Sequence, residues 1–143
     1  MKRTLSAGLV LFGSALLLQG PASAHVTNLT IDSVAYQKVD GSVVISGTIT
    51  CTAGERFRVG ANLTQDQGTT DVEANKLRAD QGDCTGAPTP YRFNMVPDDN
   101  TESFNTTDPA TVQVVGESGF TGTNNRHGIS ESETAPIDIQ PQP

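Results

Sequence analysis

The sequence predicts an all-β fold: an immunoglobulin-like sandwich of two sheets, with about seven strands and one disulfide bond. The first observation is composition, because the chain after residue 24 contains 17 Val and Ile and 17 Thr but only 3 Leu. β-Branched residues favour the pleated sheet. The second is a period-two alternation of apolar and polar residues, and the third is a regular series of turn sequences. A small barrel is the alternative architecture.

The first 24 residues have the pattern of a secretory signal peptide. Lys2 and Arg3 supply positive charge, and a mostly apolar run of twelve residues extends from Ala7 to Leu18. This run is shorter than the roughly 20 residues that a membrane-spanning helix needs. Residues 22–24 then form a small-residue cleavage site. We therefore expect a secreted, extracellular protein, with an uncleaved membrane anchor as the alternative.

Cleavage after residue 24 leaves one β-sandwich domain over residues 25–140 and a short flexible tail over residues 141–143. The whole chain has a net charge of −7, and loss of two basic residues with the signal peptide makes the remainder −9. A strongly negative chain is repelled by nucleic acid and by anionic lipid. The charge therefore argues against binding to nucleic acid or to a membrane surface, and we expect no membrane insertion after cleavage.

The first predicted strands flank a hairpin sequence, Asp40-Gly41. Residues 27–36 precede this turn and residues 42–51 follow it, with Val43, Ile45, Ile49 and Cys51 on one face. In residues 56–65 the apolar positions again alternate with polar ones, and the turn sequences Ala53-Gly54 and Gln67-Gly68 bound this strand. The inward residues of this third strand are Phe57, Val59, Ala61 and Leu63.

The remaining strands are expected at residues 70–78, 90–96, 110–116 and 134–140. Residues 71–80 form the best helix candidate in the chain, and we interpret them as a strand. Alternation is regular in the next two strands, with Tyr91, Phe93 and Met95 on one face of the first and Ala110, Val112 and Val114 on one face of the second. Residues 117–133 are rich in Gly, Asn, Ser and Thr, which leaves a long loop or a weak extra strand open.

The exported part of the chain contains two cysteines, Cys51 and Cys84. An even number of cysteines in an exported protein indicates a disulfide, and here only one pairing exists. The alternative is a metal or redox pair, but the Cys-x-x-Cys spacing typical of such pairs is absent. We therefore expect a structural disulfide.

The run from Asp40 to Cys51, Asp-Gly-Ser-Val-Val-Ile-Ser-Gly-Thr-Ile-Thr-Cys, resembles a segment of small uncharacterised secreted domains from high-GC Gram-positive bacteria. Residues 59–65, residues 84–86, and Phe104 with residues 109–112 extend the resemblance, which covers roughly residues 31–115. Where that family has Trp after its second Cys, this chain has Tyr91 and Phe93. The resemblance implies an immunoglobulin-like fold and pairing of the two cysteines, and it implies no activity.

No catalytic motif stands out in the sequence. Gly-x-Ser-x-Gly, Ser-x-x-Lys and His-Glu-x-x-His are all absent, as is a phosphate-binding glycine loop. The sequence therefore predicts a non-enzymatic extracellular binding module without a cofactor, whose partner is unknown. An enzyme that uses some pair of its 16 acidic residues is a further alternative.

The sharpest chemical alternative is copper binding by His25 and His127, the only two histidines. Cleavage after residue 24 would make His25 the first residue, so its α-amine and imidazole could both bind one metal ion. A second imidazole would complete a three-nitrogen site suited to copper. This arrangement resembles secreted copper-trafficking domains and polysaccharide monooxygenases, which implies His25 and His127 as ligands.

Two charged groups are weaker candidates. Residues 98–100, Asp-Asp-Asn, lie near Glu102 and could supply oxygen ligands to calcium, although an acidic turn is the simpler interpretation. Arg56, Arg58 and Arg92 share the outward parity of their strands. They could form a small anion-binding ladder, or they could pair across the sheet with acids such as Asp71 or Glu73.

Overall fold

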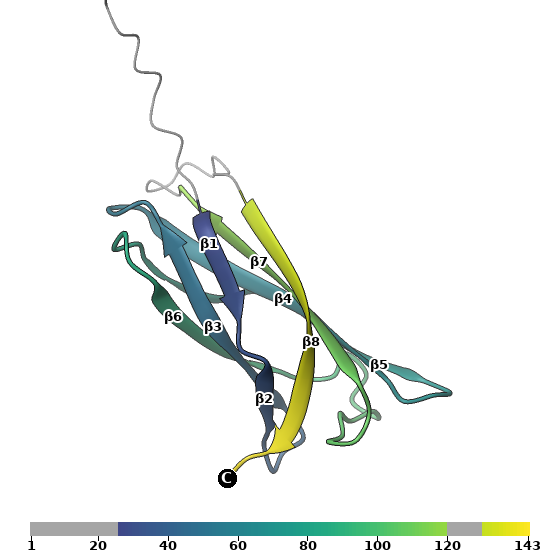
Figure 1. Ribbon diagram of the computed structural model, residues 1–143. Coiled ribbons are helices and arrows are strands. Elements are labelled where there is room, and N and C mark those ends of the chain that lie inside the picture. The colour runs from purple at the N-terminus through teal and green to yellow at the C-terminus, as the bar shows by residue number, and fades with distance from the viewer. Residues whose placement is uncertain (1–25, 120–129) are drawn as a thin grey trace, which may run out of the picture.

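The computed structural model describes residues 26–119 and 130–143, and strands are the only regular secondary structure in these residues (Figure 1). The described residues contain no helix that could cross a membrane. The eight strands are β1 (Val26–Ile31), β2 (Val34–Gln37), β3 (Val43–Cys51), β4 (Arg56–Asp66), β5 (Asp71–Asp83), β6 (Thr89–Met95), β7 (Ala110–Ser118) and β8 (Ser130–Pro141).

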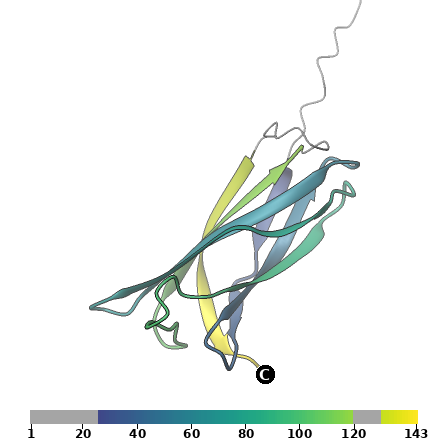
Figure 2. The ribbon, with the colours of Figure 1, turned by 180° about the vertical axis from the view of Figure 1, so that it is seen from behind.

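The hydrogen-bond ladders join the strands in the order β1-β3-β2-β8-β7-β4-β5, and β6 pairs with the other side of β3. β8 connects two groups of strands, because its last residues pair parallel with β2 and its earlier residues pair antiparallel with β7. β1 and β3 lie in front of β4 in Figure 1 and behind it in Figure 2. The sheet therefore folds over on itself, and its inner surfaces face each other.

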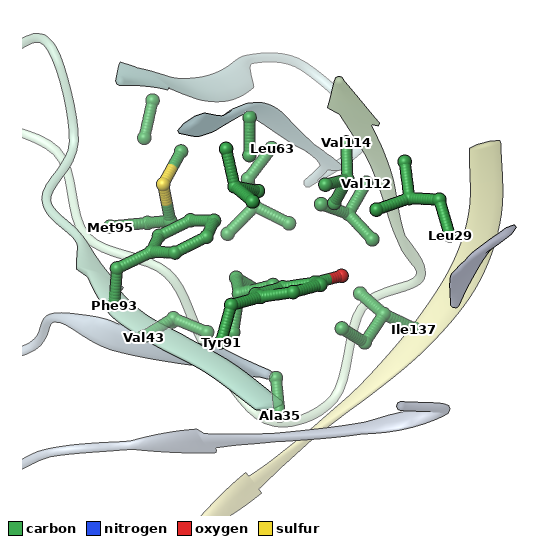
Figure 3. Close-up of a cluster of buried hydrophobic side chains, with 14 of the residues drawn as sticks. Leu29, Ala35, Val43, Leu63, Tyr91, Phe93, Met95, Val112, Val114 and Ile137 are labelled. Atoms are coloured by element: carbon green, nitrogen blue, oxygen red, sulfur yellow. The ribbon is translucent and has the colours of Figure 1, made fainter. Parts of the chain in front are cut away.

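The core lies between these two layers, where the alternation in the sequence directs the apolar side chains. On β6, Tyr91 and Phe93 extend toward Leu63 of β4 and Val112 of β7 (Figure 3). The two aromatic rings stack with their centroids 5.8 Å apart. All of these side chains are buried, as are Val43, Ile45 and Ile49 of β3 and Ile137 and Ile139 of β8. The period-two pattern thus predicted the buried faces of β3, β4, β6 and β7.

The described residues form eight strands where the sequence predicts about seven, because residues 27–36 form two strands. The pairing of β1 with β3 ends at Ile31, and the chain then forms β2, which lies between β3 and β8 and pairs in parallel with β8. The two residues between the strands form backbone hydrogen bonds to β3 on one side and to β8 on the other. Asp32 donates its N–H to the carbonyl oxygen of Ser46, and Ser33 accepts the N–H of Asp138. The other six strands form where the sequence predicts them, and several are longer.

The segment that the sequence left open, residues 117–133, belongs partly to strands. β7 includes Glu117 and Ser118, and β8 begins at Ser130, so that Glu117 pairs with Ser130. Residues 120–129 lie outside the described residues, as does the predicted signal peptide of residues 1–24. At the other end of β8, Gln142 donates its N–H to the carbonyl oxygen of Gln37.

The predicted disulfide between Cys51 and Cys84 is confirmed, with a Cα–Cα distance of 5.3 Å. Cys51 is the last residue of β3, and Cys84 directly follows β5. Both residues are buried, and the backbone of Cys84 is also held by hydrogen bonds to Gly54 and Glu55. The bridge therefore ties the layer that contains β3 to the β4–β5 hairpin.

Candidate functional site

The copper ligands suggested by the sequence, His25 and His127, lie outside the described residues. The residues that the structure does describe contain no group of three His, Cys, Asp or Glu side chains placed to hold a metal ion. The strands that precede and follow the two histidines share one end of the molecule: β1 begins, β7 ends and β8 begins there (Figure 1). Copper binding therefore stays a prediction.

In the acidic turn considered for calcium, the carboxylates of Asp98 and Asp99 accept hydrogen bonds from other residues of the chain. Asp99 accepts the hydroxyl of Thr101 at 2.7 Å and its backbone N–H at 2.8 Å, and these two hydrogen bonds lower the pKa of Asp99. Asp98 accepts the backbone N–H of Asn75 at 3.1 Å and donates its own N–H to Glu73. The turn thus attaches the chain after β6 to β5, which is a structural role.

Of the two possibilities for Arg56, Arg58 and Arg92, pairing across the sheet occurs at Arg56. Arg56 pairs with Asp83, directly across from it on β5, at 3.6 Å, whereas Asp71 and Glu73 lie at the far end of the same hairpin. Arg58 is opposite Gln81 on β5 and Glu117 on β7. Arg92 lies on β6, in the other layer, where its backbone N–H donates to Asp80. A further arginine, Arg78 on β5, is one that the sequence analysis did not single out.

The β4–β5 pairing contains a pronounced bulge. Val59 pairs with Asp80, and Ala61 pairs with Lys76, so three residues of β5 lie opposite Gly60 alone. Bulges of this kind bend a strand and redirect its side chains. The exposed fraction of Leu77 is 84%, and Arg78 has a φ of 55°, the one positive φ among the described residues that are not glycine.

Gly60 accommodates the close approach of the bulge with little crowding. A Cβ atom at this position would lie 3.0 Å from the carbonyl oxygen of Lys76 and 3.4 Å from the backbone nitrogen of Arg78. The surface is hollowed here, and Gly60 is part of the lining. The depression has a volume of about 220 Å³ and is lined by Arg58, Val59, Gly60, Leu77, Arg78, Val115 and Glu117.

This depression combines positive charge with exposed apolar surface. Arg58 and Arg78 supply two guanidinium groups and Glu117 one carboxylate, while Leu77 and Val115 supply aliphatic side chains. All 16 Asp and Glu residues of the chain are described, and none forms an ion pair with Arg78. An Arg beside an exposed aliphatic side chain is a surface suited to a ligand that is itself part anionic and part apolar.

A second depression, of about 440 Å³, lies where the loop before β7 meets β8. Its two acidic side chains are engaged in the fold, because Asp108 accepts the side-chain N–H of Asn105 at 2.6 Å and Asp138 accepts that of Gln140 at 2.8 Å. Its remaining lining is mostly hydroxyl and proline side chains. The bulge depression is the better candidate, since its charged and apolar groups converge.

One irregularity in the sequence could have indicated the bulge. Val72 and Ala74 are buried on β5 and share even parity, whereas Leu77 has odd parity and would point outward in a regular strand. A large apolar residue on the exposed parity of a strand is a signal of an irregularity or a contact surface. The position of Arg78 beside Gly60 depends on strand pairing, so it could not be predicted from the sequence alone.

The chain matches no family model, no curated protein and no solved structure.

Proposed function

We propose that this protein is an exported, non-catalytic binding module with an immunoglobulin-like sandwich fold, and that it contacts an extracellular partner at the β5 bulge. The observation that carries the proposal is the convergence of Leu77, Arg78 and Gly60 at one depression. Arg78 has a positive φ, which is costly for a residue with a side chain, and the aliphatic side chain of the adjacent Leu77 is exposed. Such features concentrate at sites of recognition.

The strand order supports the immunoglobulin-like part of the proposal. The pairing β8-β7-β4-β5 corresponds to the G-F-C-C′ order of variable-type immunoglobulin domains, and β1-β3-β6 corresponds to A-B-E. The disulfide is placed differently from that of antibody domains, because Cys84 follows β5 instead of lying within β7. The likeness therefore concerns the order of the strands.

Export is supported by the disulfide together with the signal-peptide pattern of residues 1–24. The test is to express the full chain with its own leader in a secreting bacterial host and to determine the mass and N-terminal sequence of the protein in the medium. The proposal expects a first residue of His25 and no free thiol. Retention of the whole chain in the cells would contradict it.

Contact through the bulge is tested by site-specific photo-crosslinking. A photoreactive amino acid replaces Leu77 in one variant and Val39 in the control, since Val39 is also apolar and fully exposed but lies between β2 and β3. Each purified protein is irradiated with the extracellular fraction of its source cells. The proposal expects a discrete adduct from position 77 that excess unlabelled protein suppresses, and none from position 39. Equal adducts from both positions would contradict it.

The second candidate function is copper binding by His25 and His127, and one observation favours it. The strands that adjoin both histidines in the chain reach the same end of the molecule (Figure 1). Copper(II) is titrated into the correctly cleaved protein and into a variant with one additional residue before His25. The copper hypothesis expects tight binding that the additional residue and His127→Ala each abolish. Weak binding that neither change affects would exclude it.

A further inference from the structure

We infer that the depression at the β5 bulge binds the C-terminal residue of a peptide whose last side chain is apolar. The inference rests on the proposed function and adds the chemical class of the ligand. Arg78 would hold the terminal carboxylate, and Leu77 and Val115 would contact the terminal side chain. Three properties of the depression lead to this ligand: its charge, its size and the way in which Arg78 is positioned.

The charge of the depression matches a single carboxylate. Glu117 is the one acid in the lining and Arg58 is already engaged within the fold, which leaves Arg78 as the cation for a ligand, in a chain whose net charge is −7. The surrounding negative charge disfavours a polyanion, and Glu117 repels a second negative group within the site. A planar guanidinium binds a carboxylate through two parallel hydrogen bonds, and Arg78 has no ion pair in the described residues that would compete.

The size of the depression limits the ligand to a small group. Pockets for drug-sized ligands begin at about 300 Å³, and this depression has a volume of about 220 Å³. A terminal residue presents its carboxylate and its side chain from the same Cα atom. Both can therefore reach Arg78 and Leu77, which are adjacent in the chain. An internal Asp or Glu would bring the carboxylate without the apolar group.

The bulge fixes the backbone of Arg78 before any ligand arrives. Its φ of 55° is a conformation that a residue with a side chain rarely adopts. The backbone on both sides is fixed by pairing, since Lys76 opposite Ala61 and Asp80 opposite Val59 bracket the bulge. Gly60 permits the close approach of this backbone. A guanidinium on a fixed backbone loses less entropy on binding than one on a flexible loop.

The test uses three synthetic peptides and the exported, disulfide-bonded protein labelled with ¹⁵N. The probes are N-acetyl-Ala-Ala-Leu with a free carboxylate, the same peptide as its C-terminal amide, and N-acetyl-Ala-Ala-Gly with a free carboxylate. The inference expects the first peptide to shift the amide resonances of Gly60, Leu77, Arg78 and Val115 saturably. The other two should bind at least about tenfold more weakly. Equal shifts from the amide, or no saturable shift from any peptide, would overturn the inference.

Matched variants separate loss of the site from loss of the fold. Arg78→Gly removes the guanidinium while accepting the positive φ, and Leu77→Ser removes the apolar contact. Arg56→Gln is the control, because Arg56 is a cation on β4 that pairs with Asp83 and does not line the depression. The inference expects binding to be lost in the first two variants and kept in the control. Loss in all three, or in none, would overturn it.

The crosslinking experiment tests the proposed function and the peptide titration tests the ligand class, so one proposal can fail while the other is supported. An adduct from position 77 without binding of the free-carboxylate peptide would overturn this inference and leave the binding module in place with another ligand. Absence of the adduct together with saturable binding of that peptide would support the ligand class while contradicting contact with a partner in the extracellular fraction.

Discussion

The hydroxyl group of Tyr91 on β6 donates a 2.6 Å hydrogen bond to the carbonyl oxygen of Thr30 on β1, across the backbone of β3. The two strands are not paired with each other, because β3 lies between them. The side chain crosses at Gly47, where a Cβ atom would collide with both the Tyr91 ring and the Thr30 carbonyl group. The Tyr91 side chain therefore connects β6 to β1 across β3.

The first prediction concerns this hydrogen bond. Tyr91→Phe keeps the buried ring and its stacking on Phe93 but leaves the carbonyl oxygen of Thr30 without its partner. We expect the free energy of unfolding to fall by about 1 kcal/mol. Urea denaturation followed by circular dichroism measures the difference, with Tyr36→Phe as the control because Tyr36 lies at the surface. An equal loss in both variants would contradict the role of the hydrogen bond.

The second prediction concerns alkaline pH. Burial raises the pKa of Tyr91 well above its ordinary value, and the negative charge of Asp32 raises it further. Since the folded state disfavours the phenolate, the stabilisation is fully present below the pKa of the unfolded chain, about 10. It is lost as the pH rises above that value. The urea midpoint of the wild type should therefore fall more steeply above about pH 10 than that of Tyr91→Phe, and parallel curves would be evidence against this linkage.

The third prediction concerns Gln65, which is buried at the end of β4. Its side chain donates to the carbonyl oxygens of Asn105 and Asp108, each at 2.9 Å, and accepts the backbone N–H of Asn105 at 2.9 Å. Gln65→Leu leaves these backbone groups without partners, so we expect a loss of about 2–4 kcal/mol. Hydrogen exchange at the Asn105 amide should accelerate. The exposed Gln113, on the adjacent strand, provides the control variant Gln113→Leu, whose stability should change by less than about 0.5 kcal/mol.

The fourth prediction concerns the disulfide. Cys51 and Cys84 are separated by 33 positions, and a loop of that length stabilises the fold by about 4 kcal/mol through the entropy of the unfolded chain. The double variant Cys51→Ala, Cys84→Ala should therefore have a free energy of unfolding lower by about that amount. Urea denaturation of both proteins without reductant measures the difference. A loss below about 1 kcal/mol would mean that the unfolded chain is already compact.

The sequence could predict what depends on local pattern. Alternation in residues such as Phe57, Val59 and Leu63 predicted a strand and its buried face, and the even cysteine count predicted the bridge. It could not predict the division between β1 and β2, because that depends on which neighbouring strand offers hydrogen bonds on each side of Asp32. The bulge depends in the same way on how many residues of β5 lie opposite Gly60.

The fifth prediction tests whether the bulge stores strain at Arg78. A side chain at positive φ costs on the order of 1 kcal/mol relative to glycine, whereas glycine in an ordinary strand position destabilises by roughly 0.5–1 kcal/mol. Arg78→Gly should therefore leave the free energy of unfolding unchanged or raise it. Arg56→Gly, on the paired strand and without a positive φ, should lower it. Urea denaturation of the two variants under one set of conditions gives the comparison. If Arg78→Gly destabilises the protein as much as Arg56→Gly does, the positive φ of Arg78 carries no strain. The backbone conformation of Arg78 would then be no argument for a binding site at the bulge.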